Sequence, residues 1–410
     1  YEIQKVYQDV WFSPDNLDQG RIRVKNHHDF TNLSRYEFRW QLKEDGRVTQ
    51  SGKLNTVNVA PHETGEISVP LNLDELNSEK ENVLEITVHL REDKEWAASG
   101  FAVAGEQFVL EDYDYPEIQP IEQKKVDVEE NEQTIEMRAG RYSATVDRKN
   151  GALLSYRTGK QEYIKQPLEP YFWKVPNDNQ KRNNYEDRLG EWKYAGKRRQ
   201  VTDVKIEPSG KGLAEITFKM ELMPWESDYE LTYILNGNGA LQVEANYIPG
   251  KNDIPLIPKF GMRMGIPDSY NNIEWYGRGP HENYQDRKRS AFYGVYKQTV
   301  EEFITSYIAP QDNANRCDVR WTKFTNAEGK GVEIHGLQSL SFRSWPYTEK
   351  DIEQASHDHQ LPRRDMININ VDLKVHGVGG DNSWGKRTLP KYTLGGNQPY
   401  SYGFILKTVE

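Results

Sequence analysis

Hydrophobic and polar residues alternate along many short stretches of the chain, and this two-residue period predicts β-strands. In the first part of the chain the alternation is clear at residues 21–25, 36–42 and 84–90. The pair Asp45-Gly46 predicts a hairpin between two of these strands. Short strands separated by turn residues at intervals of about ten positions are typical of a β-sandwich.

Strand signals return at residue 134 and continue to the end of the chain. Alternation is strongest at residues 142–147, 214–218, 229–234 and 241–247, and we find no helical period lasting three turns. A region of roughly 275 residues built from strands has to curl or stack its sheets to bury their faces. The sequence therefore predicts a large sandwich of antiparallel sheets.

The stretch between these two regions lacks periodicity. Residues 113–133 are rich in acidic residues and contain two prolines, which is typical of a linker. We therefore expect an all-β chain with one sandwich over residues 1–112, a linker over 113–133 and a larger sandwich over 134–410.

Composition narrows the possible functions. Hydrophobic residues make up only 36% of the 410, but 24 Tyr, 13 Phe and 10 Trp supply large packing surfaces. The net charge of −10 disfavours binding to nucleic acid, which requires a basic face. A weakly polar ligand such as a sugar is compatible with an acidic protein, although acidic surfaces also simply maintain solubility.

The single cysteine, Cys317, excludes an intrachain disulfide and a cysteine-based metal site. No apolar run reaches the ~18 residues of a membrane span, so no membrane partner is expected. The sequence begins with Tyr1 rather than Met, and we therefore expect a piece of a longer polypeptide. Its location, cytoplasmic or periplasmic, stays open.

The segment 275–284 combines aromatic residues, two glycines and polar groups. His281 and Glu282 could exchange protons with a sugar hydroxyl. Alternatively, Arg278 and Asn283 hold a rigid loop by internal hydrogen bonds, as buried polar groups usually do.

Two other segments carry candidate polar chemistry. Residues 307–316 are rich in amides that suit sugar hydroxyls or turns, and Asp312 beside Asn313 could contribute an oxygen ligand to a hard cation. His357 and His359 are spaced as two metal ligands on a strand, but the charged residues around them also fit a solvated loop.

Residues 375–385 contain four glycines, three before Trp384 and one directly after it, so they predict an exposed loop with a large indole at its end. An exposed indole can stack on the apolar face of a pyranose, while Asp381 and Asn382 bind nearby hydroxyl groups. Trp384 could equally fill a gap in its own domain.

Taken together, these motifs resemble the last two domains of the large family 2 β-galactosidases over nearly the whole chain. The matching stretches are residues 1–8, 26–33, 105–108, 172–179, 277–284, 311–316 and 379–384. The resemblance implies an immunoglobulin-like sandwich followed by a large antiparallel sandwich similar to galactose mutarotase.

The resemblance also implies functional residues. In the family, a tryptophan after a Gly-Gly-Asp-Asp-Ser pattern reaches the galactose site, and that role carries over to Trp384, with Asp381 and Asn382 beside it. Asn382 departs from the second acid of the pattern, and Lys174-Val175 departs from Arg-Ala. Further residues in the matching loops are candidates for facing the sugar: His281, Glu282, Asp178, Asn179, Asp312 and Asn313.

Enzymes of this family are retaining hydrolases that use two glutamates of a (β/α)8 barrel. The resemblance implies that this barrel precedes Tyr1. Asn131-Glu132, the only Asn-Glu pair of the chain, lies in the acidic linker, which offers none of the burial that a general acid needs. The chain is therefore expected to hold no catalytic residue, metal or cofactor. Any Mg or Na would be bound mainly in the barrel.

The expected partners are a galactoside and the missing N-terminal and barrel domains of a homo-oligomeric enzyme. A second hypothesis is an independent sugar-active domain. It would be either a carbohydrate-binding module or an aldose epimerase that uses His281 and Glu282 as its acid and base.

Overall fold

The computed structural model describes residues 1–72, 75–207, 212–251 and 253–410, and its chain divides into two compact units. The first unit consists of Tyr1–Asp114 with the short segments Tyr276–Pro280 and Lys288–Val295. The second consists of Tyr115–Trp275, His281–Arg287 and Tyr296–Glu410. Strands dominate both units, so the prediction of an all-β chain is confirmed.

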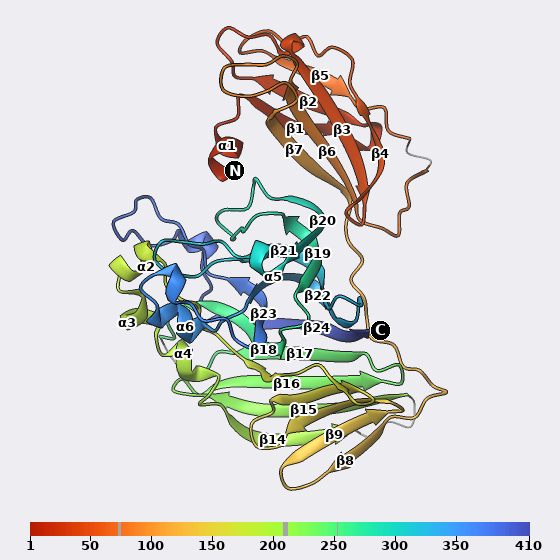
Figure 1. The fold of residues 1–410 in the computed structure, drawn as a ribbon, viewed down its shortest axis with the longest axis vertical. Helices are drawn as coiled ribbons and strands as arrows, with labels where there is room; N and C mark the ends of the chain where they lie inside the picture. Colours follow the sequence, from red (N-terminus) through yellow and green to blue (C-terminus); the bar gives the residue numbers. More distant parts are fainter. Residues whose placement is uncertain (73–74, 208–211, 252) are drawn as a thin grey trace. The chain divides into compact units, whose positions relative to one another are not determined.

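The first unit is a sandwich of two antiparallel sheets (Figure 1). Among the described residues one sheet has the order β1-β2-β5 and the other the order β4-β3-β6-β7. The strands are β1 (Val10–Asn16), β2 (Arg21–Asn26), β3 (Tyr36–Glu44), β4 (Arg47–Lys53), β5 (Thr64–Ser68), β6 (Asn82–Leu90) and β7 (Ala102–Glu111). The short helical elements are α1 (Glu2–Val6), η1 (Leu17–Gln19) and η2 (Leu33–Arg35).

The alternation seen in the sequence places one side chain in two inside this sandwich. Leu84, Ile86 and Val88 of β6 are buried in its core, and Trp40 of β3 packs there with them. Complete burial of each such aliphatic side chain contributes about 1.5–3 kcal/mol. The hairpin predicted at Asp45-Gly46 joins β3 to β4.

The first unit also contains part of a distant hairpin. The backbone N–H of Tyr293 donates to Gln107 Oε1 at 2.6 Å, and that of Ser290 donates to Glu2 Oε2 at 2.9 Å. Residues 276–280 and 288–295 are grouped with the first unit because of contacts of this kind, which the alternation pattern does not encode.

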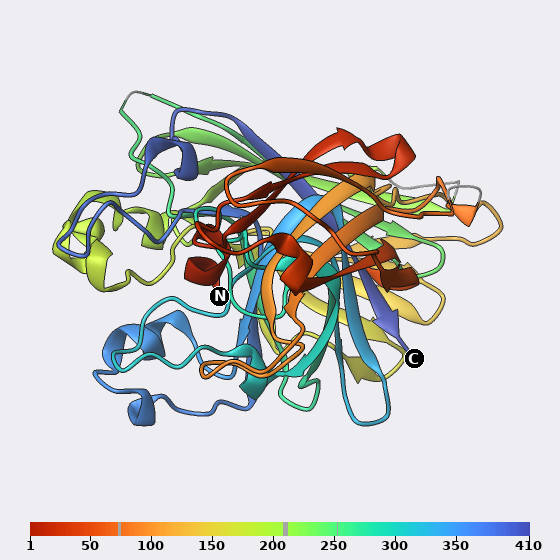
Figure 2. The ribbon, with the colours of Figure 1, turned by 90° about the horizontal axis from the view of Figure 1, so that it is seen from above.

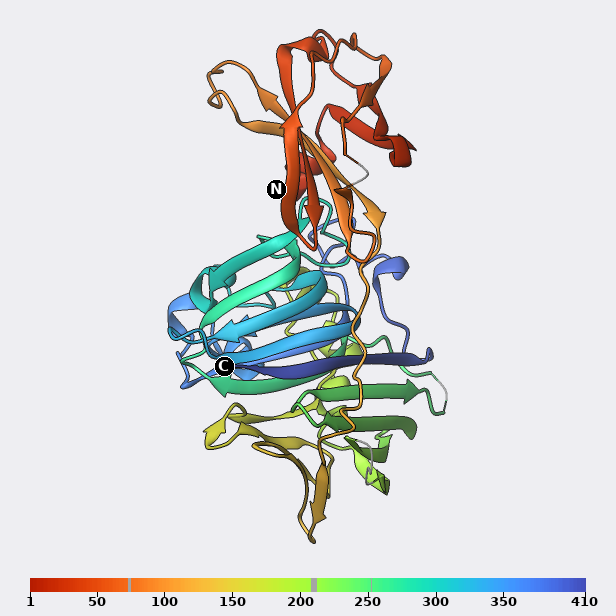
Figure 3. The ribbon, with the colours of Figure 1, turned by 90° about the vertical axis from the view of Figure 1, so that its right-hand side faces the viewer.

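The second unit is one large antiparallel sheet that curls on itself (Figure 3). One run of neighbours is β14-β15-β16-β17-β24-β22, and β22 continues through β23 and β18 to β13. The first strands are β8 (Asp127–Glu130), β9 (Thr134–Ala139), β10 (Tyr142–Asp147), β11 (Leu153–Thr158), β12 (Gln161–Glu162) and β13 (Gln166–Pro170). The middle strands are β14 (Gln200–Glu207), β15 (Leu213–Leu222), β16 (Ser227–Asn236), β17 (Leu241–Ile248) and β18 (Lys259–Pro267). The last strands are β19 (Asn272–Gly279), β20 (Phe292–Thr299), β21 (Arg316–Thr325), β22 (Gly331–Trp345), β23 (Met366–Val375) and β24 (Tyr400–Val409).

The helices of the second unit are short and several gather at one end of the curled sheet (Figures 1 and 2). They are α2 (Asp178–Arg182), α3 (Tyr185–Leu189), α4 (Trp192–Ala195), α5 (Val300–Phe303), α6 (Glu349–Gln354), η4 (Asp358–Gln360) and η5 (Pro390–Tyr392). No helix in the described part of the chain is long and apolar enough to span a membrane.

The stretch expected to be a linker, 113–133, differs from that expectation at its C-terminal end. Residues Asp127–Glu130 form β8, which pairs with β9. Val126 is buried and Val128 packs against the core, so two valines hold an otherwise acidic segment on the sheet. The three acidic residues of this strand dominated its sequence pattern and masked the strand.

Candidate functional site

The glycine-rich segment predicted to be an exposed loop connects β23 to η5 in the second unit. Trp384 lies on it with 76% of its surface exposed, and the guanidinium carbon of Arg182 is 5.4 Å from the centre of its ring. Asn382 Oδ1 accepts hydrogen bonds from the backbone N–H groups of Trp384 (2.9 Å) and Lys386 (3.3 Å). The turn that carries the indole is therefore held by the amide predicted to touch substrate.

Asp286 anchors the beginning of this loop. Its carboxylate accepts hydrogen bonds from the backbone N–H groups of Val378 (3.1 Å) and Gly379 (2.7 Å). Gly377 lies so close that a Cβ there would be 2.6 Å from Asp286 Oδ2. Any residue larger than glycine would therefore collide with the anchoring carboxylate.

The segment around α2 contacts both the beginning and the end of the loop. Asn179 Oδ1 accepts from the N–H of Gly385 at 2.7 Å, and its Nδ2 donates to Lys386 O at 3.0 Å. Asn177, the N-cap of α2, also donates from Nδ2 to Val378 O at 2.8 Å. Gly385 has a φ of 106°, which a residue with a side chain rarely adopts.

Replacement of Asp286 by alanine is expected to loosen this loop without unfolding the unit. Two hydrogen bonds to a charged acceptor disappear, each contributing about 1.5–3 kcal/mol. Hydrogen exchange at Val378 and Gly379 is expected to accelerate at least tenfold. Asp381→Ala is the matched control, because Asp381 is exposed on the same loop. Unchanged protection of both amides in Asp286→Ala would contradict the anchoring role.

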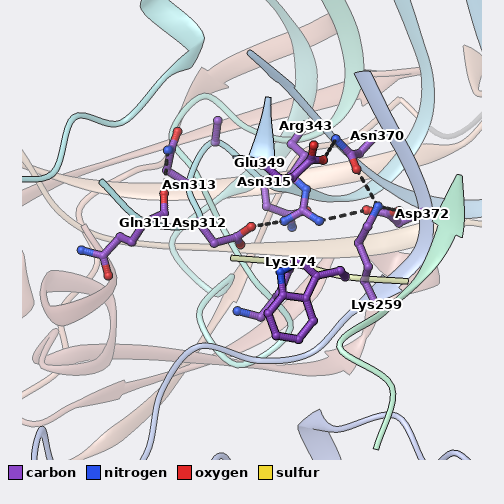
Figure 4. A network of polar contacts seen from close by, with 12 residues as sticks. Lys174, Lys259, Gln311, Asp312, Asn313, Asn315, Arg343, Glu349, Asn370 and Asp372 are labelled. Atoms are coloured by element: carbon purple, nitrogen blue, oxygen red, sulfur yellow. Dashed lines mark hydrogen bonds and ion pairs between the residues drawn. The ribbon is translucent and has the colours of Figure 1, made fainter. Parts of the chain in front are cut away.

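A network of buried charges lies beside this loop, on one face of the curled sheet (Figure 4). In β18 the apolar residues Phe260, Met262, Met264 and Ile266 pack in the main core, while Lys259 and Arg263 point to the opposite face. In β23, Asn368, Asn370 and Asp372 likewise alternate with apolar core residues and point to the opposite face. Lys259 Nζ is 2.6 Å from Asp372 Oδ1 and donates to Asn370 Oδ1, also at 2.6 Å.

Arg343 of β22 connects two acids of this network. It forms an ion pair with Asp312, and its Nη2 is 3.6 Å from Asp372 Oδ2. Burial raises the pKa of the Asp372 carboxyl, although Lys259 and Arg343 oppose this effect. All three side chains of these ion pairs have no exposed surface, which makes the network costly unless each charge is matched.

Lys174 is a further buried cation, and it lacks an acidic partner within ion-pair distance among the described residues. Its Nζ donates to Gln180 Oε1 at 2.7 Å and lies 5.3 Å from the centre of the Tyr185 ring. Burial lowers its pKa to about 8, against the opposing attraction of Asp312. Lys174 is one of the residues at which the sequence departs from the pattern that it resembles.

Glu282 is engaged within its own domain. Its Oε1 accepts from Arg287 Nη2 at 2.7 Å and from the Tyr307 hydroxyl, and its Oε2 accepts from the N–H of Ala314 at 3.0 Å. The backbone carbonyl of His281 accepts from Asn283 Nδ2 at 3.0 Å. This arrangement favours the interpretation of segment 275–284 as a rigid, internally bonded loop.

Asp312 and Asn313 are buried rather than presented at the surface. Tyr284 donates its hydroxyl to Asp312 Oδ2 at 2.9 Å, and Trp345 Nε1 donates to Asn313 Oδ1 at 3.1 Å. Asp178, by contrast, is exposed at the start of α2. Of the predicted residues, the structure therefore gathers Asp178, Asn179, Asp381, Asn382 and Trp384 at one loop cluster.

His357 and His359 lie in and before η4 with their rings stacked at a centroid distance of 5.6 Å. No cluster of three or more His, Cys, Asp or Glu side chains suited to a metal ion occurs in the described part of the chain.

Several residues of this region were not found from the sequence: Lys259, Asp286, Arg343, Asp372, Tyr185 and His376. A signal for the charged ones exists in the strands, because Lys259 and Arg263 alternate with apolar residues. Polar residues that alternate with apolar ones in a strand are normally expected to face solvent. Only the curvature of the sheet shows that these residues lie in the interior.

Known families and proteins match the chain along its length. The family described as "Beta galactosidase small chain" matches residues 138–406, and "Beta-galactosidase, domain 4" matches residues 22–111. A β-galactosidase of Priestia megaterium is 33% identical over 407 residues, which cover 99% of this chain and 39% of that protein. A β-galactosidase of Halalkalibacterium halodurans is 30% identical, and the match covers 100% of this chain and 40% of that protein.

Among solved structures, a galactose mutarotase related enzyme from Lactobacillus acidophilus aligns with 70% of this chain and 97% of its own, with a TM-score of 0.38 and 10% identity. The family matches cover both units. The chain belongs to the β-galactosidase family, of whose curated members it spans about two fifths.

Proposed function

We propose that this chain is the C-terminal part of a retaining β-galactosidase that hydrolyses terminal β-D-galactosides. In that enzyme it supports the fold and supplies one aromatic wall of the galactose pocket, Trp384. The observation that carries the proposal is the exposure of this indole on a loop that is anchored at both ends. A large apolar ring kept in solvent gains most when it covers another apolar face, and pyranose C–H groups offer one.

The catalytic carboxylates are expected in the remainder of the enzyme. Glu132, the glutamate preceded by asparagine, is exposed in the bend before β9, where solvent surrounds its carboxyl. Glu282 has both oxygens occupied by internal donors. A general acid of a retaining glycosidase needs a burial that raises its pKa and a second carboxyl about 5 Å away. We therefore expect no galactoside hydrolysis by this chain alone.

Trp384→Ala in the whole enzyme tests the proposed wall. Loss of the stacking surface is expected to raise KM for an aryl galactoside about 10-fold to 100-fold, corresponding to roughly 1–3 kcal/mol. Trp384→Phe should recover part of this loss, because it restores a smaller ring at the same position.

The matched control is Trp96→Ala. Trp96 is also exposed, with 66% of its surface accessible, but it lies in the first unit. Its replacement should leave KM and kcat near their original values. Unchanged kinetics in Trp384→Ala would exclude the stacking role, and turnover by the isolated chain would exclude the assignment of chemistry to the rest of the enzyme.

A further inference from the structure

The exposed indole of Trp384 has two ring faces, and one of them meets a cation of its own unit. The guanidinium carbon of Arg182 lies over the ring, 5.4 Å from its centre, which is within the range of a cation–π contact. The indole nevertheless keeps 76% of its surface exposed. The contact with Arg182 therefore leaves the other face of the ring open to a ligand.

The side chain of Arg182 has no competing partner. Arg182 is the last residue of α2, and it is exposed. Within the described part of the chain it forms no ion pair, and Asp178, one turn earlier on the helix, lies 3.8 Å from Lys181 instead. The indole is therefore the group that holds this guanidinium in place.

The backbone of Arg182 also supports the segment that carries the indole. Gly385, directly after Trp384, lies so close that a Cβ there would be 2.9 Å from Arg182 O and 3.3 Å from Arg182 Cβ. Asn179 of the same helix accepts a hydrogen bond from the N–H of Gly385 at 2.7 Å. Both the indole and the backbone that follows it thus rest on α2.

The helix α2 is a fixed support, although it has only five residues. Asn177 Oδ1 accepts from the N–H of Gln180 at 2.9 Å, and Gln180 Oε1 accepts from the N–H of Asn177 at 3.2 Å, which completes a capping box. Gln180 is 2% exposed, and its Oε1 also accepts from the buried Lys174 Nζ at 2.7 Å. The helix that carries Arg182 is therefore tied to the interior of the unit.

An exposed aromatic side chain binds a ligand better when its orientation is set in advance. A side chain that is free to rotate loses rotamer freedom when a ligand immobilises it, and this loss weakens binding. A cation–π contact at an exposed site is weak, but it favours the ring orientation that brings the ring under the cation. A ligand that stacks on the opposite face then meets a ring that is already oriented.

We propose that Arg182 is a positioning residue for galactoside binding. Its guanidinium covers one face of Trp384 and thereby turns the other face toward the pyranose ring. Arg182 acts through the indole and does not itself contact the sugar. This inference rests on the proposed function of Trp384 as a wall of the galactose pocket.

Kinetics of the whole enzyme with an aryl galactoside test the inference. Arg182→Gln is expected to raise KM about 2-fold to 5-fold, the loss that corresponds to one exposed cation–π contact, and to leave kcat nearly unchanged. Arg182→Lys should recover part of the loss, because it keeps the charge but not the planar group that lies flat on a ring. The matched control is Lys181→Gln, which removes the adjacent exposed cation of α2 and should leave KM unchanged.

A double-mutant cycle separates positioning from direct contact with the sugar. In the Trp384→Ala background, Arg182→Gln should change KM no further, because the ring that it positions is gone. If Arg182 bound the sugar itself, its loss would raise KM by the same factor in both backgrounds. That result would overturn the inference.

A fluorine resonance reports the surroundings of the ring without any catalysis. The 410-residue chain is labelled with 5-fluorotryptophan, and the resonance of Trp384 is the one among ten that Trp384→Phe lacks. Arg182→Gln should shift this resonance and leave the others in place. Lys181→Gln should leave all ten unchanged.

The two measurements together distinguish failure of this inference from failure of the proposed function. An unchanged KM in Trp384→Ala would overturn both, even if the fluorine resonance shifts in Arg182→Gln. A raised KM in Trp384→Ala with an unchanged KM in Arg182→Gln would overturn only the positioning role and leave the aromatic wall in place. A raised KM in Arg182→Gln without a shift of the resonance would also overturn it, because the arginine would then act by a route other than the indole.

Discussion

Replacing Arg343 by alanine is expected to lower the free energy of unfolding of the second unit by about 3–5 kcal/mol. Arg343 lies between Asp312 and Asp372, and none of the three side chains is exposed. Its loss would leave the buried carboxyl groups of Asp312 and Asp372 without the cation that they share, while Lys259 pairs only with Asp372. A buried charge without a partner raises the free energy of the folded state by more than the original ion pair lowered it. The variant is therefore expected to be less stable.

Two further variants separate charge from packing. Arg343→Met keeps much of the side-chain volume but removes the charge, so it should also be strongly destabilised. Arg363→Ala removes an arginine that is 56% exposed and pairs with Glu301, and it should change stability by less than about 1 kcal/mol. Denaturant unfolding followed by fluorescence gives these values. Near-normal stability of Arg343→Met would show that volume, not charge, sets the cost.

The stability of the second unit is expected to rise between about pH 8 and pH 10 because of Lys174. Burial lowers the pKa of this amine to about 8 in the fold, from the ordinary lysine value of 10.5. Below pH 8 both the folded and the unfolded chain carry the proton, and the fold bears the full cost of a buried cation. Between the two pKa values the fold has lost the proton while the unfolded chain keeps it, so the cost is relieved.

Lys174→Met isolates this contribution. When the unfolded chain binds one proton more than the folded chain, the free energy of unfolding rises by at most about 1.4 kcal/mol per pH unit. Lys174→Met has no proton to lose at this position, so its free energy of unfolding should lack this contribution. At pH 7 it should be as stable as the unaltered chain or more so, because an apolar side chain replaces a buried charge. Lys160→Met, on an exposed turn, should keep the original slope. Identical pH profiles for Lys174→Met and the unaltered chain would contradict the shifted pKa.

The sequence alone indicated both the family and many of the strands. Side chains point alternately to the two faces of a strand. The alternation at residues 229–234 and 241–247 therefore predicted β16 and β17 without any tertiary information. The weakest strand, β8, was missed because its pairing with β9 and its two valines are tertiary contacts. The strand propensity of a short segment does not reflect such tertiary contacts.

The candidate site was predictable only in part. Four glycines close to Trp384 indicate an exposed loop whatever the fold, and the indole is indeed exposed. The anchors of that loop come from residues about 93 and 206 positions away, Asp286 and Asn179. A sequence shows that Asn179 is polar, but it does not show that both ends of its amide are used by the loop.

The sequence by itself determined the all-β class, many of the strands and the glycine-rich loop, because these follow from alternation, turn residues and glycine content over a few neighbouring positions. The structure decided that Trp384 on this loop is exposed and does not fill a gap in its own domain. The tertiary structure decided which polar residues are interior. Lys259, Arg343 and Asp372 lie on strands whose second face would normally meet water, and the curled sheet turns that face inward. Charge is then matched across β18, β22 and β23, since an interior with little water leaves each ion dependent on its neighbours.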